Sequence, residues 1–148
     1  SFLILSAVVL LGVLFDIIGT AATAADIAPL NAKAARKVTG ARRGVYLVQH
    51  ADQVANFCND VVGDISGIIS GTLVVIIVLR IVSSWQQPRA DLYVGIVLTA
   101  LVAAITVGGK AWGKTLAIKR STEVVLFVGK IINRLEKPLE WFKPDQRN

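Results

Sequence analysis

The sequence predicts an all-helical membrane protein with three transmembrane helices, and three observations support this fold class. The 148-residue chain is 54% hydrophobic and 18% charged, whereas soluble domains carry about 25% charged residues. It contains three apolar segments long enough to cross the roughly 30 Å hydrocarbon core of a bilayer. Its Lys and Arg residues gather in blocks: none lies between Arg43 and Arg80, and nine of the sixteen lie from Lys110 onward.

The first span is predicted over residues 2–27. Asp16 is the only charged residue before Asp26, so the stretch is long enough for the roughly 20 helical residues that span the hydrocarbon core at 1.5 Å rise each. Pro29 disfavours helical geometry at Ala28, the residue before it. We therefore expect the first helix to end at Ala28.

A basic cluster follows the first span over residues 31–43 and is divided by Gly40. Its alternation of Ala with Lys and Arg predicts short basic juxtamembrane helices that lie on the membrane surface. The next segment begins near Gly44, is amphipathic to about Asn56, and then becomes apolar. We predict the second span over residues 54–83.

A polar loop over residues 83–88 reverses the chain before the third span, predicted over residues 92–112. The helical pattern continues beyond that span to Lys119. We assign residues 1–120 to one three-span domain. Residues 121–148 are predicted to form a C-terminal amphipathic juxtamembrane helix and a tail, because apolar residues recur there at helical spacing beside a basic face.

The distribution of basic residues predicts the orientation of the chain. The first loop holds five Lys and Arg residues and the C-terminal region nine, whereas the second loop holds only Arg80 and Arg89. Lys and Arg are enriched in cytoplasmic loops. We therefore expect a multi-pass protein of the inner or plasma membrane, with its N terminus outside and its C terminus in the cytoplasm.

Several functional classes have no support in the sequence. There is no nucleotide-binding loop, no Gly-rich dinucleotide turn and no pairing of a nucleophile with a base; His50 is the only histidine. The basic residues flank apolar spans, where they meet lipid headgroups, so they do not indicate nucleic-acid binding. We expect a protein that is not an enzyme and whose partners include membrane lipids.

Polar residues inside the spans are the candidate functional groups, because an ionisable side chain at membrane depth costs at least about 2.5–3.5 kcal/mol. Asn56, Asp60 and Asp64 recur every four residues, which predicts one stripe on a helix. Side-chain oxygens converging between helices suit hard cations such as Mg²⁺. The candidate cation ligands are Thr20, Thr23, Asn59, Asp60, Asp64 and Ser70.

A structural role for the two aspartates is the alternative interpretation. Asp60 and Asp64 could pair with Lys110, or with Lys114, and hold the bundle together without binding any ion. A row of small residues at spacing four accompanies them in the second span, and such rows allow close approach of another helix. Its members are Gly63, Gly67 and Gly71.

Four motifs follow one another along nearly the whole chain. They are F-D-I-I-G-T-A-A-T-A-A-D, F-C-N-D-V-V-G-D-I and G-G-K-A-W-G-K-T-L-A, in the three spans, and L-E-K-P-L-E-W at the end of the amphipathic helix. In order and spacing, this chain resembles the transmembrane domain of the cyclin-M/CorC magnesium transporter family. That family shows G-S-E-T-A, I-G-N-x-L-V-N and G-E-x-x-P-K-x-L-A at the first three places and a juxtamembrane helix at the fourth.

The resemblance implies a homodimer that binds Mg²⁺ in an inward-facing polar cavity lined by serine, asparagine and glutamate side chains. It also implies cytoplasmic regulatory domains, which here would belong to a separate regulatory subunit or to a continuation of the chain. Position by position, Gly19 and Thr20 match the Gly-Ser of the first motif. Asn59 matches the Asn of the second motif, and Lys114 matches the Lys of the third.

This sequence departs from the family at two glutamates and a proline. The glutamate positions hold Ala21 and Lys110, and the proline position holds Gly113. The leading hypothesis is a divalent-cation transporter of this type. The alternative is a membrane scaffold or regulatory subunit that transports nothing, in which Lys110 neutralises Asp60 and Asp64.

Overall fold

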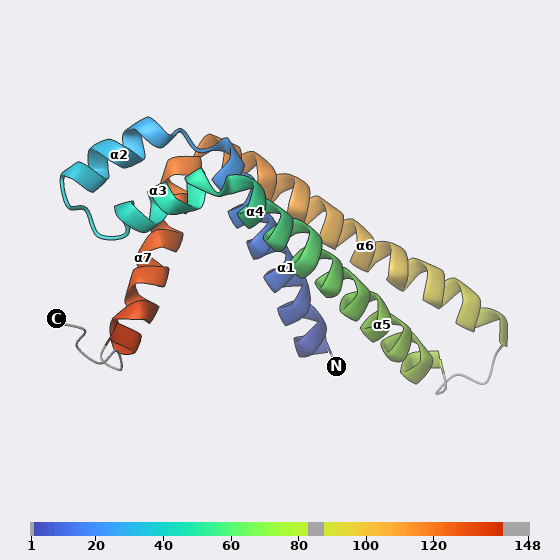
Figure 1. Ribbon diagram of the computed structural model, residues 1–148. Coiled ribbons are helices and arrows are strands. Elements are labelled where there is room, and N and C mark those ends of the chain that lie inside the picture. The colour runs from blue at the N-terminus through green and yellow to red at the C-terminus, as the bar shows by residue number, and fades with distance from the viewer. Residues whose placement is uncertain (1, 83–87, 141–148) are drawn as a thin grey trace.

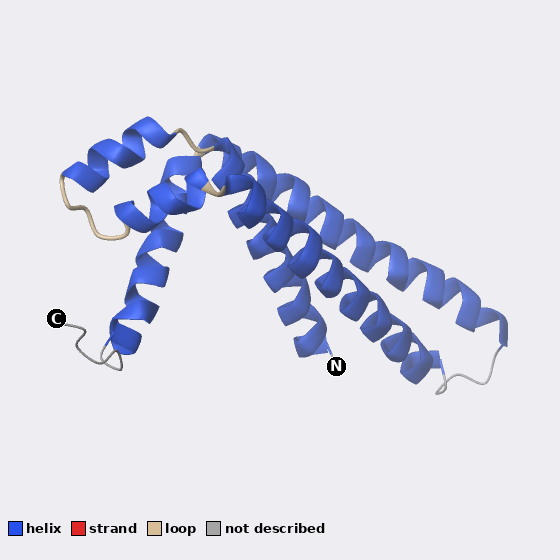
Figure 2. Cartoon of the chain, viewed as in Figure 1, coloured by secondary structure: helices blue, strands red, loops and turns tan. Residues whose placement is uncertain are grey.

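The computed structural model describes residues 2–82 and 88–140, and within them every regular element is a helix (Figure 2). The predicted loop at 83–87 and the tail at 141–148 lie outside the described residues. The elements are α1 (Phe2–Ala24), α2 (Ile27–Ala35), α3 (Ala41–Gln49), α4 (Ala51–Ala55), the π-helix η1 (Asn56–Val62), α5 (Gly63–Val82), α6 (Pro88–Lys119) and α7 (Ser121–Glu140).

The helices form two groups. The bundle consists of α1, α6 and the continuous rod α4–η1–α5, which pack side by side (Figure 1). The cap consists of α2, α3 and α7 and lies at the end of the bundle where α1 ends and α6 ends (Figure 1). Three helices are long and apolar enough to cross a membrane, over Phe2–Ala24, Ala51–Ile81 and Tyr93–Lys119. The predicted all-helical class with three candidate membrane spans is therefore confirmed.

The end of the first helix differs from the prediction. Helix α1 ends at Ala24, and a second helix begins at Ile27 and contains Pro29 in its first turn. Asp26 starts that second helix, because its carboxylate accepts a hydrogen bond of 3.1 Å from the backbone N–H of Ala28. Proline is tolerated in a first helical turn, where its missing N–H leaves no bond unmade. The expectation that Pro29 ends the first helix at Ala28 is wrong.

A tight reversal joins α2 to α3. The backbone N–H groups of Lys37 and Val38 donate to the carbonyl oxygens of Ala34 and Lys33, both at 3.0 Å. This pair of hydrogen bonds ends a helix and requires one residue in the left-handed region, a position that glycine usually occupies. Here Lys37 occupies it, with φ of 56°.

Helices α3 and α7 cross at a point where only glycine fits. A Cβ on Gly129 would overlap the carbonyl oxygen of Gly40 and lie 3.0 Å from the backbone nitrogen of Gly44. A Cβ on Gly40 would in turn lie 2.5 Å from the nitrogen of Lys130. The backbones of α3 and α7 are therefore in direct contact, which fixes the cap.

The second predicted segment is broken once before it enters the bundle. Helix α3 ends at His50, whose backbone N–H and ring Nδ1 lie 3.1 and 3.0 Å from the carbonyl oxygen of Tyr46. The amphipathic part predicted to run from Gly44 to about Asn56 therefore consists of two helices, with α3 in the cap and α4 at the start of the rod.

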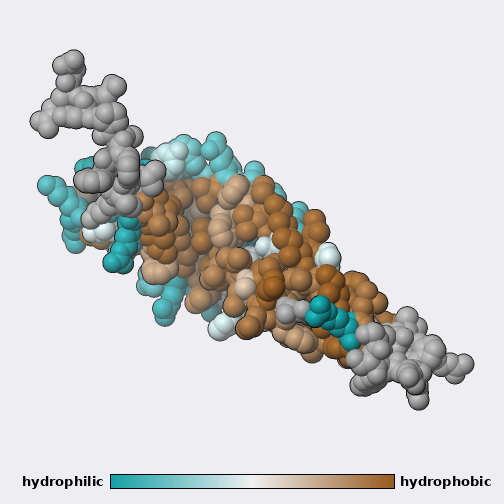
Figure 3. Space-filling view, turned by 90° about the horizontal axis from the view of Figure 1, so that it is seen from below, coloured by the Kyte–Doolittle hydropathy of each residue, from teal (hydrophilic) through white to brown (hydrophobic). Residues whose placement is uncertain are grey.

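Buried apolar residues form two clusters, one in each group of helices. The cap cluster reaches across to α1 and α6 and consists of Ala21, Leu30, Ala41, Ala117, Val125 and Leu126. The bundle cluster consists of Leu5, Val74 and Ile77. Much of the remaining apolar surface is exposed and covers the middle of the molecule in Figure 3. Such a surface suits a lipid environment.

Candidate functional site

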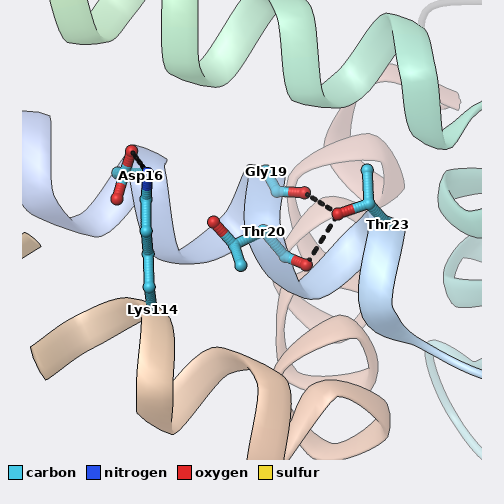
Figure 4. A network of polar contacts seen from close by, with 5 residues as sticks. All are labelled: Asp16, Gly19, Thr20, Thr23 and Lys114. Carbon is cyan, nitrogen blue, oxygen red and sulfur yellow. Dashed lines mark hydrogen bonds and ion pairs between the residues drawn. The ribbon is translucent and has the colours of Figure 1, made fainter. Parts of the chain in front are cut away.

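A buried carboxylate lies between α1 and α6. Asp16 is 4% exposed, and its Oδ1 lies 3.6 Å from the Nζ of Lys114 (Figure 4). The Lys114 side chain is 51% exposed, so its ammonium reaches the carboxylate from the open side of the pair. The second carboxylate oxygen, Oδ2, is buried and has no hydrogen-bond partner among the described residues. Lys114 therefore compensates the charge of Asp16 from a distance too long for a hydrogen bond, and Oδ2 keeps no partner among the described residues.

Glycine on α6 allows this pair to form. A Cβ on Gly113 would lie 2.8 Å from the Cγ1 of Ile17, and a Cβ on Gly109 would lie 3.5 Å from the Cγ2 of Val13. The two helices are thus in close contact at Ile17, the residue after Asp16. Gly113 is the residue at the proline position of the family motif, so this departure from the motif has a local packing role.

A second unpartnered oxygen lies further along the same face of α1. The Oδ1 of Asn59 is buried and has no hydrogen-bond partner in the described part of the chain. It lies against Gly19, where an added Cβ would be 2.5 Å from it and 3.1 Å from the Cβ of Cys58. Gly19 follows Asp16 by three residues and therefore shares its side of the helix. The carboxylate of Asp16 and the amide of Asn59, which lies against Gly19, are thus on the same side of α1.

A π-helical segment places Asn59 in this position. Residues Asn56–Val62 form seven residues of π-helix, whose wider turns bond residue i to i+5. The predicted stripe of Asn56, Asp60 and Asp64 does not face α1. Cys58 and Asn59 face α1, whereas Asp60 and Asp64 are exposed. Asn56, the first member of the stripe, is exposed as well.

Lys110 lies near the predicted aspartates without bonding to them. Its Nζ is 3.7 Å from the position that a Cβ on Gly63 would take, and its side chain is half-buried. Among the ion pairs of the described residues, none joins Lys110 to Asp60 or Asp64. The carboxylate–ammonium pair that the structure forms inside the bundle is Asp16–Lys114.

The predicted hydroxyl ligands bond to their own helices. The hydroxyl of Thr23 donates to the carbonyl oxygens of Thr20 at 2.9 Å and Gly19 at 3.4 Å (Figure 4). The buried hydroxyl of Ser70 donates to the carbonyl oxygen of Gly67 at 2.9 Å. A hydroxyl that donates in this way keeps its lone pairs and can still accept a cation. Thr20 is half-buried on the same stretch of α1 as Asp16 (Figure 4).

The predicted small-residue row divides into two parts. Gly63 is buried beside Lys110. Gly67 and Gly71 are exposed, and a Cβ on either would meet no atom within 4 Å. Within the described residues these two glycines pack against no other helix.

Asp16 is the candidate residue that the sequence predictions left out. It is the first charge in a long apolar helix, and that fact alone marks it as costly and in need of a partner. The sequence predicts Lys110 as the charge partner of Asp60 and Asp64, because Lys110 holds a glutamate position of the third motif. Lys114, four residues later and one helical turn further on, is the lysine that reaches a carboxylate.

Comparison of the chain with known protein families, with curated proteins and with solved structures finds no match.

Proposed function

We propose that the chain is the membrane domain of a divalent-cation transporter similar to the cyclin-M/CorC family, with Mg²⁺ as the transported ion. The observation that carries the proposal is the pair of buried acceptor oxygens without donors, Asp16 Oδ2 and Asn59 Oδ1, on one side of α1. Buried acceptors are nearly always bonded, and those that are not require an explanation such as an ion or water. Both belong to the oxygen types that Mg²⁺ and Ca²⁺ prefer.

The arrangement supports binding of a partly hydrated ion. Mg²⁺ demands six oxygens and commonly keeps several of its waters, so one carboxylate and one amide are a sufficient protein contribution. The half-buried hydroxyl of Thr20 is a further oxygen on the same face. Asp60, Asp64, Thr23 and Ser70 remain proposed contributors along the route of the ion rather than at this site.

Lys114 gives the proposed site a way to exchange its ion. Without a cation, its ammonium neutralises Asp16 at 3.6 Å. Because the Lys114 side chain is half exposed, the ammonium can move into water at a modest cost when a divalent ion arrives. Ion and ammonium therefore compete for one carboxylate. We propose that the ion enters from the cap, which would lie on the cytoplasmic side, and that exposure of the site then alternates across the bilayer.

Titration calorimetry of Mg²⁺ into the detergent-purified chain tests this function. Asp16→Asn and Asn59→Leu should each weaken binding by at least about tenfold, the loss expected for one charge-assisted contact of about 1.4 kcal/mol or more. Lys114→Gln should strengthen binding because it removes the competitor. The matched control is Asp60→Asn, the same chemical change at an exposed carboxylate, which should leave the affinity within about twofold.

The scaffold remains the second candidate function, and the Asp16–Lys114 ion pair is the observation that favours it. In a scaffold the pair would hold α1 to α6 and no ion would enter. The native chain would then bind no Mg²⁺, and binding would emerge only in Lys114→Gln or Lys110→Glu. Loss of binding in Asp60→Asn but not in Asp16→Asn would move the site to the stripe predicted from the sequence.

We also propose that two copies of the chain associate through the open part of the small-residue row. Gly67 and Gly71 are exposed on α5 and would let a second helix approach closely. Gly67→Leu should convert a dimer to a monomer in light scattering of the detergent complex. Gly108→Leu is the matched control, because Gly108 is equally open but lies on α6. A native chain that is monomeric would contradict the dimer.

A further inference from the structure

A cavity in the cap carries an excess of positive charge. Its volume is about 680 Å³, and it lies where the α2–α3 reversal meets α7. Its polar wall consists of Lys37, Thr39, Arg42, Arg43, Tyr46 and Asn133. Among the described residues, no carboxylate belongs to that wall. The chemistry of the cavity therefore fits an anion.

A second cavity adjoins the first and extends its charge. It has a volume of about 260 Å³, shares Thr39 and Asn133 with its neighbour, and adds Lys130 and Arg134. Lys37, Arg42, Lys130 and Arg134 have no ion-pair partner among the described residues. Four cations from the α2–α3 reversal, α3 and α7 thus line adjoining cavities in which the described residues supply no carboxylate. Like charges gathered in this way repel one another, and a bound anion would relieve that repulsion.

The backbone holds one of these cations in an unfavourable conformation. Lys37 has φ of 56°, in the left-handed region that costs a non-glycine residue free energy. Strained residues of this kind persist where the surrounding structure fixes them, and they cluster at ligand sites. Glycine adopts this conformation at less cost, and the lysine that stands here instead lines the cavity.

An apolar stripe on α7 runs beside the basic cavities. Phe127, Ile131 and Leu135 recur every four residues and are 64%, 43% and 64% exposed. Lys130 and Arg134 border this stripe on the same helix, and both are exposed. A helix with basic residues along an exposed apolar stripe lies at a membrane interface. The cap also adjoins the ends of the helices that can cross the membrane.

We propose that the two cavities form a binding site for the phosphate headgroup of an anionic phospholipid, whose acyl chains extend along the stripe of α7. The cations supply charge-assisted hydrogen bonds to the phosphate oxygens, and the hydroxyl of Thr39 and the amide of Asn133 supply neutral ones. A soluble phosphate would use the cations but gain nothing from the stripe. The juxtaposition of both surfaces therefore favours a lipid. This site is independent of the proposed ion site in the bundle.

Native mass spectrometry of the full detergent-solubilised chain tests the proposal, with phosphatidylglycerol and phosphatidylcholine as the probes. The native chain should retain phosphatidylglycerol at least about tenfold more tightly than phosphatidylcholine. Each cation near a lipid surface contributes a factor of about five, so Lys37→Gln combined with Arg42→Gln should weaken phosphatidylglycerol binding by about twenty-five-fold. The control pair Lys33→Gln with Lys119→Gln removes two charges that line neither cavity, and it should change binding by less than twofold.

A Lys37→Gly variant and a competition with inorganic phosphate complete the test. Lys37→Gly relieves the strained backbone and removes one charge, so it should raise the melting temperature while it lowers phosphatidylglycerol affinity about fivefold. This outcome separates loss of charge from loss of fold. Equal retention of the two lipids, an unchanged affinity in the Lys37 and Arg42 variants, or complete displacement of the lipid by millimolar inorganic phosphate would each overturn the lipid site.

Discussion

The cap and the bundle bury apolar residues by different means. In the cap, Leu30 and Ala41 are fully buried and α3 meets α7 through glycines in backbone contact. In the bundle, no residue in the most apolar stretch of α6 is buried. The cap therefore packs like the interior of a soluble protein, while the bundle presents its apolar side chains to its surroundings. The comparison indicates that protein side chains, including Ala21 of α1 and Ala117 of α6, close the core of the cap, whereas the apolar surface of the bundle suits contact with lipid.

The proposed ion site lies between these two regions. Asp16 and Asn59 are placed where α1 is covered on two sides, by α6 and by the π-helical segment. Further toward the N terminus of α1, Leu3 is 87% exposed. A carboxylate there would face hydrocarbon with little protein around it, at the full cost of an isolated charge. The end of α1 nearer the cap is the part of the span where the chain can shelter polar groups.

Adding a methyl group at the cap crossing should give the largest effect. In Gly129→Ala the new Cβ overlaps the carbonyl oxygen of Gly40, and a backbone contact cannot relax by a change of rotamer. We expect a loss of about 3 kcal/mol in the free energy of unfolding, the upper end for overpacking. Thermal unfolding in detergent measures it. Gly108→Ala is the control: its Cβ meets nothing, so it should be neutral or stabilise by up to about 1 kcal/mol. Equal melting temperatures for the two variants would contradict the account of the cap.

Removal of the ammonium from the buried pair should give the next largest effect. In Lys114→Met the carboxylate of Asp16 stays buried without its partner, which costs about 3–5 kcal/mol in a fully buried pair. Because Lys114 is half exposed, we expect about 2 kcal/mol here. Asp16→Asn should lower the free energy of unfolding by less, since the remaining ammonium of Lys114 is solvated. The double variant, Asp16→Asn with Lys114→Met, should recover part of the stability that Lys114→Met loses. A larger loss of stability in Asp16→Asn than in Lys114→Met would show that Lys114, and not Asp16, is the buried residue of the ion pair.

Relief of the strained lysine should give a smaller effect of opposite sign. Lys37→Gly removes the left-handed penalty of a Cβ and should stabilise the cap by about 1 kcal/mol. Hydrogen exchange of the α2–α3 reversal would detect slower local opening. Lys33→Gly, four residues earlier inside α2, is the matched control and should destabilise by about 1 kcal/mol. Faster exchange in Lys37→Gly would contradict the assigned backbone conformation.

Replacement of the buried amide should give the smallest effect on stability. Asn59→Leu removes an acceptor that has no donor, so stability should change by less than about 1 kcal/mol while Mg²⁺ binding is lost. Chemical or thermal unfolding measured beside calorimetry separates the two effects. A loss of several kcal/mol would indicate that the Asn59 amide supports the fold instead of waiting for a ligand.

The fold was readable in the sequence because long apolar segments and basic loops leave few alternatives in a bilayer. The connection after the first span is not evident from the sequence. Pro29 predicts the end of a helix, but Asp26 caps a new helix, and proline fits in the first turn of that helix. The site was readable only in part. Asn59 and Thr20 belong both to the predicted set and to the proposed site, whereas Asp60 and Asp64 of the predicted stripe are exposed.

Two features of the site have no clear sequence signal. Nothing in Asn56–Val62 marks an extra residue in the turn, because π-helical hydrogen bonds depend on how η1 packs against α1. Which of Lys110 and Lys114 reaches Asp16 likewise depends on how α6 packs against α1, where Gly113 lies close to Ile17. Asp16 could have been identified from the sequence, by treating a lone charge within a span as functional from the start.

The most direct measurement is a crystal structure of the chain in lipid with Mn²⁺, whose anomalous signal locates the ion. The account predicts a peak within coordination distance of Asp16 Oδ2 and Asn59 Oδ1, with the Lys114 ammonium withdrawn from the carboxylate. A peak beside Asp60 and Asp64, or an intact Asp16–Lys114 pair at saturating Mn²⁺ with no ion between α1 and η1, would contradict it.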